Sequence, residues 1–211
     1  MITEEMLVNI EKGFSAGGET GWDLPIRFFI LSENGRLGHL GLPMWIYDDY
    51  PNPVELINML AENQREELKL LQTIGVPYTE AHPEQAANGR AVGLIAVFES
   101  YGMLGPTYEA AIASLTDTER DALIAEYGRI PMSHFKDAVE QRNVMAIDDD
   151  LVFCLLTRYR KTDKLLFITE RDAGWNSYGP MNDAMVSLFG AFKASWDYEA
   201  TAQAAREGDK E

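Results

Sequence analysis

The side chains best suited to chemistry are few, and they are scattered along the 211-residue chain. Cys154 is the single thiol and lies inside an apolar segment, where burial raises the pKa of a thiol and makes it inert. We interpret it as a core residue. His39, His82 and His134 lack the spacing of a zinc site, which needs three or four converging ligands. The sequence therefore predicts no metal and no cofactor, and it leaves any catalytic residues unknown.

Two other segments contain residues that could bind a ligand, but their sequences are more typical of turns. Residues 148–150 are three aspartates, and clustered carboxylates attract hard cations, yet EF-hand spacing does not follow them. Aspartate also stabilises hairpin turns, which is the interpretation that we favour. Residues 35–41 carry glycine at every third position. A phosphate-binding loop would lead directly into a helix, whereas this run leads to Pro43, so we expect a hairpin return.

A repeated Gly-Trp motif is the most suggestive feature. Gly-Trp occurs twice, each time followed by a short polar residue and each time at one end of a predicted strand. Tryptophan beside convergent polar groups is typical of a small-molecule pocket or of a protein-binding hot spot. The alternative is that both tryptophans cap the core while their polar neighbours hold turns. The candidate ligand- or partner-binding residues are Trp22, Asp23, Arg27, Trp175, Asn176 and Tyr178.

Hydrophobic periodicity and turn residues predict the elements that would position these side chains. Asn52, Pro53 and Gly75 bound the clearest helix, over residues 53–74. Asn34-Gly35 is a strong hairpin signal. Strands are expected at 26–31, 91–98, 144–147, 151–159 and 164–169, with a weaker one within 37–45, and further helices at 3–14, 107–115, 116–128 and from Pro180.

This order predicts an α+β fold with a mainly antiparallel sheet. Hairpin-length connections join the last three strands into a meander, which the long helix near 53–74 and the C-terminal helix would pack against. We expect a single domain over 1–199 and a frayed or disordered acidic tail over 200–211. The polar stretch 77–87, with two prolines, is the best candidate for a boundary within the chain.

The net charge of the chain limits the classes of partner that it is expected to bind. The net charge is −16, from 34 acidic and 18 basic side chains, which disfavours direct binding of nucleic acid and of anionic membranes. Scattered acidic residues suit solubility better than mimicry of a nucleic acid, which would need aligned carboxylates. One cysteine fits a reducing compartment, and neither a signal peptide nor a membrane span is evident in the sequence. We expect a cytoplasmic protein.

The first Gly-Trp segment also resembles a known family. Residues 21–31 read GWDLPIRFFIL, and they are similar to the opening of an uncharacterised family of small actinobacterial cytosolic proteins that reads G-W-D-x-P-x-R-L-F-x-L. Phe28 stands where the family has leucine. Residues 92–99 resemble the family's second strand, and 158–160 with Asp163 resemble its late hairpin. The resemblance implies an actinobacterial or actinobacteriophage origin, and it implies no activity.

Three functions are consistent with these residues. The first, which we favour, is a non-catalytic binding or interaction protein that uses an apolar-aromatic patch near Trp22 and Trp175, with a protein or small molecule as its unknown partner. The second is an enzyme or small-molecule-binding protein with a pocket near Trp22, Asp23 and Arg27. The third is an acidic mimic of nucleic acid. The sequence does not define an oligomeric state.

Overall fold

A computed structural model of the chain describes residues 2–16, 22, 24–50, 52–102, 105–127, 130–160, 162, 164–169 and 180–208. These residues form an α+β fold around one antiparallel six-stranded sheet, as the sequence predicts. The strand order is β2-β1-β3-β4-β5-β6. Their bounds are β1 Arg27–Ser32, β2 Leu37–Leu40, β3 Ala91–Gly102, β4 Val139–Asp148, β5 Phe153–Tyr159 and β6 Leu165–Thr169.

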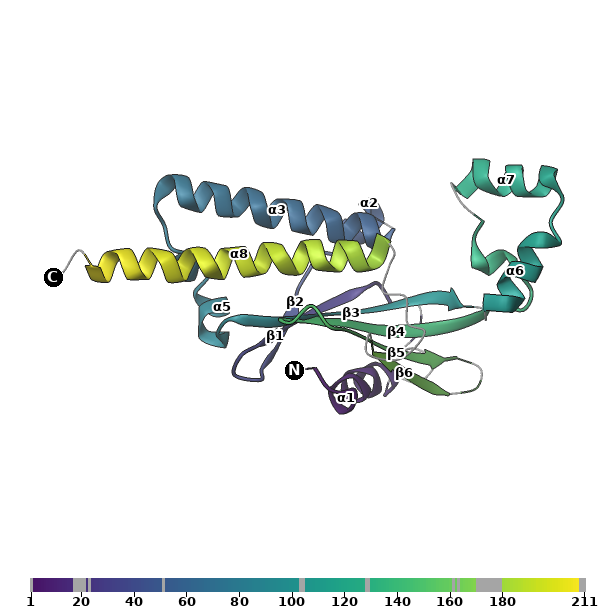
Figure 1. Cartoon of the computed structure of the whole chain (residues 1–211), viewed down its shortest axis with the longest axis horizontal. Helices are drawn as coiled ribbons and strands as arrows, with labels where there is room; N and C mark the ends of the chain where they lie inside the picture. Colours follow the sequence, from purple (N-terminus) through teal and green to yellow (C-terminus); the bar gives the residue numbers. More distant parts are fainter. Residues whose placement is uncertain are drawn as a thin grey trace.

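Helices cover both faces of this sheet (Figure 1). Two long helices, α3 (Pro53–Ile74) and α8 (Pro180–Gly208), lie side by side on one face and run in the same direction. Helix α1 (Glu4–Ser15) covers the other face. The remaining helices are α2 (Trp45–Asp49), α4 (Tyr78–Ala81), α5 (Pro83–Asn88), α6 (Gly105–Ala113), α7 (Asp117–Tyr127) and the 3-10 turn η2 (Met132–His134).

Each face of the sheet has its own apolar core, because alternate residues of a strand point to opposite faces. Phe28, Leu94 and Met185 are among the residues buried between the sheet and the α3–α8 pair. On the other face, Leu7 of α1 packs with residues such as Ile95 and Leu156. Burial of apolar surface on both faces is what holds the central strands in place.

The predicted meander is confirmed as β4, β5 and β6, and the hairpin signal at Asn34-Gly35 joins β1 to β2. The structure differs from the prediction where tertiary pairing extends an element. Strands β3 and β4 pair from Gly93↔Asp148 to Gly102↔Val139, well past the predicted 91–98 and 144–147. Helix α2 occupies the end of the predicted weak strand at 37–45. The prediction of one domain with a tail at 200–211 stays a prediction, and α8 extends to Gly208.

Helix α3 begins and ends at the residues that the sequence singles out. The Asn52 side chain accepts a hydrogen bond from the Val54 amide at 3.0 Å, Pro53 occupies the first turn, and Gly75 closes the helix with a left-handed φ of 69°. Only glycine adopts that φ without strain. Among the described residues, the structure contains no helix that is long and apolar enough to cross a membrane.

The cap at Asn52 leads to a first test of stability. We expect Asn52→Ala to lower the free energy of unfolding by about 1 kcal/mol, because the alanine leaves the Val54 amide without its acceptor. Asn52→Ser keeps an uncharged acceptor oxygen for the cap and should stay close to the wild type. Urea denaturation of the three proteins measures this difference. Equal stability of the alanine and asparagine proteins would contradict it.

Candidate functional site

Trp22, the first predicted site residue, lies against two arginines. The Arg142 guanidinium carbon is 4.5 Å from the centre of the Trp22 ring, and that of Arg160 is 5.2 Å away. Arg142 also lies 5.7 Å from the Phe14 ring. A guanidinium over an aromatic face is attracted by the ring's quadrupole, and the attraction grows when both groups are shielded from water. Trp22 therefore packs against arginine side chains on the α1 face of the sheet.

Strand register brings charged side chains together around Arg142. Arg142 of β4 lies opposite Glu99 of β3 and Arg158 of β5, so one row across the sheet carries three charges. Helix α1 adds Glu11 above this row. Arg142 contacts the Glu11 and Glu99 carboxylates at 3.4 and 3.1 Å, and Arg158 contacts Glu11 at 2.7 Å. The Glu11 side chain is 0% exposed and that of Arg142 only 1%. We call these four residues with Trp22 the arginine cluster.

The other predicted site residues divide into two groups. Arg27 opens β1 and lies near Tyr47 of α2; burial raises the pKa of the Tyr47 hydroxyl, and the charge of Arg27 partly opposes that rise. Asp23, Trp175, Asn176 and Tyr178 lie outside the described residues, so the binding patch near Trp22 and Trp175 stays a prediction.

The structure assigns turn and core roles to the residues that the sequence analysis set aside. Cys154 is buried in β5. The Asp148 carboxylate accepts hydrogen bonds from the Asp150 and Val152 amides, which is the predicted turn role. Lys193 donates a hydrogen bond to Asp149 and lowers the pKa of that carboxyl, an effect that burial opposes and that Arg90 reinforces. The described residues hold no group of three or more His, Cys, Asp or Glu side chains arranged for a metal ion.

A feature that the sequence analysis missed lies between β3 and β4. These strands pair as direct neighbours up to Gly102↔Val139, where a tight hairpin of about two to five residues would suffice. Instead, the connection spans 103–138 and includes α6, α7 and η2, which project from the end of the sheet (Figure 1). We call α6, α7 and η2 the arm. Thr116 and Glu119 form a capping box that starts α7, within the helix predicted at 116–128.

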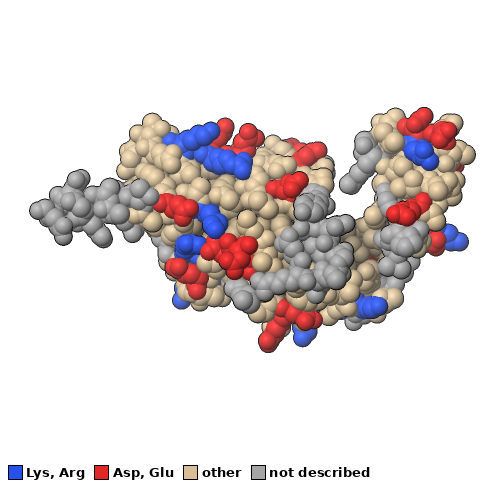
Figure 2. All heavy atoms as spheres, viewed as in Figure 1, with Lys and Arg blue, Asp and Glu red and all other residues tan. Residues whose placement is uncertain are grey.

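The arm and the body enclose a groove of about 800 Å³. The space-filling view shows the hollow between the arm and the α3–α8 body (Figure 2). Its walls are mostly apolar, and flexible methionines are prominent among them. The arm groove is lined from the body by residues 52–54, 98–101, Met145 and Met181, and from the arm by Ile124 and residues 130–133. Methionine-rich surfaces adapt to apolar partners of varied shape.

The floor of the arm groove carries a network of polar side chains from β3, β4 and β5. The Asn143 amide donates to the Ser100 hydroxyl oxygen at 2.8 Å, and Gln141 donates to the same oxygen at 3.3 Å. Thr157 donates to the Asn143 carbonyl oxygen at 2.9 Å. Two donors occupy the acceptor sites of Ser100, so its own proton is left to donate outward. Ser100 lines the groove, which thus presents one oriented hydrogen-bond donor.

Acidic and basic side chains lie next to one another on the face seen in Figure 2. Aligned carboxylates, the requirement of the nucleic-acid mimic, are not the pattern of the described residues on that face. The α3 and α8 ends that border the arm groove carry Glu55 and Asp183 in their first turns. The rim beside the groove is therefore acidic on the side of the body.

Similarity to known proteins does not identify the site, so its role must be inferred from its geometry. The resemblance to the actinobacterial family stays a prediction, and so does the origin that it implies. No family model, no curated protein and no solved structure gives a significant match to this chain.

Proposed function

We propose that this protein is a non-catalytic binding protein and that its partner inserts an apolar polypeptide segment into the arm groove. The observation that carries the proposal is a methionine-lined groove of about 800 Å³ built by an insertion that the sheet itself does not require. About two to five residues would suffice to join neighbouring antiparallel strands, so the three helical segments between β3 and β4 are additional to what the sheet needs. The proposal keeps the class of function favoured by the sequence and moves the surface from Trp22 to the arm.

Several side chains support a polypeptide as the occupant. Met145, Met181 and Ile130 offer apolar contact, which supplies most of the binding free energy of such grooves. Ser100 can donate its hydrogen bond to a backbone carbonyl of the inserted segment. Glu55 and Asp183, in the adjoining helix turns, favour a segment flanked by lysine or arginine, because opposite charges steer association.

The test is a selection of displayed random peptides on the intact protein, followed by calorimetry on the selected peptides. We expect apolar peptides with basic flanks whose affinity falls at least about tenfold, or ~1.4 kcal/mol, in Met181→Asp. Met181 lies in the first turn of α8, where the helix dipole favours a carboxylate, but its side chain also packs partly buried against the core. A circular dichroism spectrum and an unfolding midpoint equal to those of the wild type must therefore accompany the affinity of this variant. Leu70→Asp, at a 59% exposed residue of α3 outside the groove lining, is the matched control.

Two results would refute the proposal. One is a selection that yields no peptide binding to the wild type. The other is a set of peptides bound equally well by Met181→Asp and by the wild type, because such peptides would occupy another surface. A loss of affinity in Leu70→Asp equal to that in Met181→Asp would also count against the groove, since it would show a general effect of added charge.

A further inference from the structure

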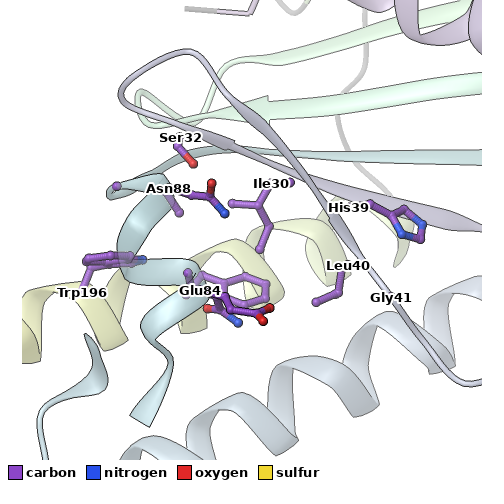
Figure 3. A pocket seen from close by; sticks show the side chains of 13 residues that line it. Ile30, Ser32, His39, Leu40, Gly41, Glu84, Asn88 and Trp196 are labelled. Atoms are coloured by element: carbon purple, nitrogen blue, oxygen red, sulfur yellow. The ribbon is translucent and has the colours of Figure 1, made fainter. Parts of the chain in front are cut away.

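A second cavity lies at the other end of the sheet, between the β1–β2 hairpin, α5 and α8 (Figure 3). We call it the hairpin pocket. Its volume is about 300 Å³, which is enough for a small organic molecule. Phe192 and Trp196, one helical turn apart on α8, form an aromatic wall, and Ile30 and Leu40 of the hairpin form an apolar one. No lining residue is shared with the arm groove.

Polar groups border this pocket at two places. In Figure 3, Asn88 of α5 lies near Ser32 of β1, and Glu84 lies one helical turn earlier on α5, away from Ser32. His39 also borders the pocket, but its ring points away and packs on Phe29 with ring centres 5.3 Å apart. Glu84 is therefore the one carboxylate among the described lining residues, and lysine and arginine are absent from that lining.

The Glu84 carboxylate has no ion-pair or hydrogen-bond partner among the described residues of the chain. The basic residues closest to the pocket in sequence are engaged elsewhere. Arg90 follows α5 and pairs with Asp149, and Lys193 of α8 contacts the same carboxylate at 2.5 Å. A cation entering the pocket would thus meet an exposed carboxylate that no described basic side chain pairs with, in a protein whose net charge of −16 already attracts cations.

The pocket walls are held in place before any ligand arrives. Tyr78 of α4 donates a hydrogen bond to the Gln85 side chain, next to Glu84 on α5. The Tyr78 ring also meets the Trp196 ring edge-on, with centres 5.8 Å apart. One buried tyrosine therefore holds both the helix that carries Glu84 and the tryptophan of the aromatic wall, and a preformed site loses less free energy on ordering itself.

From this arrangement we infer that the hairpin pocket binds a small organic ammonium compound with an apolar body. The ammonium group would lie between the Glu84 carboxylate and the Trp196 face, and the apolar body would pack on Phe192 and Leu40. A carboxylate paired with aromatic faces is the combination that recognises ammonium groups, through charge and through cation–π attraction. Asn88 and Ser32 can accept the hydrogen bonds of a primary amine.

Three probes of nearly equal shape and different charge test this assignment. Phenethylamine is the cation, 2-phenylethanol the neutral control and phenylacetate the anion, and binding is followed by chemical-shift perturbation on the intact protein. We expect phenethylamine to bind with a dissociation constant of about 1 mM or below, and the other two to bind at least about tenfold more weakly. Glu84→Gln should weaken phenethylamine binding about tenfold.

Glu80→Gln, an exposed acidic residue of α4 outside the pocket lining, is the matched control and should bind phenethylamine like the wild type. Equal binding of all three probes would show an apolar cavity without charge selection and would overturn the inference. So would undetectable binding of phenethylamine at millimolar concentration, or equal affinities in Glu84→Gln and the wild type. None of these results depends on the arm groove.

Discussion

Replacing Arg142 by alanine is expected to lower the free energy of unfolding by about 3–5 kcal/mol, the cost of breaking a buried ion pair by removing one partner. The Arg142 side chain is 1% exposed, and it bridges a fully buried Glu11 and a mostly buried Glu99. Alanine would leave both carboxylates without this cation and would remove the guanidinium from the Trp22 ring. Urea denaturation followed by circular dichroism measures the loss.

Two further variants separate the possible causes of that loss. Arg142→Lys keeps the charge but loses the planar fork that reaches both carboxylates, so we expect an intermediate stability. Arg120→Ala removes a surface arginine that lies 3.6 Å from the well-exposed Asp117, and it should cost less than about 1 kcal/mol. If Arg142→Ala cost no more than Arg120→Ala, the arginine cluster would be solvated, and its place in the core of the α1 face would be wrong.

The arginine cluster shows how much of a site one sequence can predict. Trp22 and the charged residues of β3, β4 and β5 can be read from the chain, but their meeting depends on register. Arg142 lies opposite both Glu99 and Arg158 only because β4 pairs with β3 and with β5 in one particular alignment. A shift of one residue would move every side chain to the other face of the sheet. Local pattern predicts the strands, and long-range pairing sets the site.

Helix boundaries were the most predictable part of the fold, because caps act within a few residues. Asn52, Pro53 and Gly75 bound α3, and the Thr116–Glu119 capping box starts α7, as the sequence predicts. The ends of β3 and β4 were not predictable in this way. Residues such as Glu99 and Gln141 are polar. They join strands through pairing across the sheet, where Glu99 accepts hydrogen bonds from Arg142 and Gln141 donates one to Ser100.

Neither cavity could be found from one sequence. The arm groove combines Met181, Met145 and Ile130, which lie on three separate elements. The hairpin pocket combines residues from β1, β2, α5 and α8, and the short helices α4 and α5 occupy the polar stretch 77–87 that had suggested a boundary. A usable signal did exist for the arm: a long segment with its own capping box between two strands that prove to be neighbours.

A rise to alkaline pH is expected to destabilise the protein, because the buried Tyr78 hydroxyl then ionises. This tyrosine is 1% exposed, and burial raises the pKa of its hydroxyl to about 12; the hydrogen bond from Gln64 opposes the rise, and the charge of Glu67 adds to it. The pKa of an unfolded tyrosine is about 10. Because the folded pKa is the higher one, the contribution of Tyr78 to stability is complete below about pH 10 and is lost as the pH rises toward 12.

A shift of about two pKa units corresponds to about 3 kcal/mol, so stability should fall by roughly that amount between about pH 9 and pH 12 through Tyr78 alone. Tyr78→Phe keeps the ring packing on Trp196 but has no hydroxyl to ionise. At neutral pH it should be about 1 kcal/mol less stable than the wild type, because the Gln85 hydrogen bond is gone. Its stability should then change less with pH than that of the wild type.

The deciding measurement is the slope of the unfolding free energy against pH in the wild type, in Tyr78→Phe and in Tyr101→Phe. Tyr47 also has a raised pKa, so the wild type and Tyr78→Phe both lose some stability at alkaline pH. Tyr101→Phe, at a 46% exposed tyrosine, should have the same stability as the wild type at every pH. Parallel slopes for the wild type and Tyr78→Phe would contradict the buried, proton-bound hydroxyl.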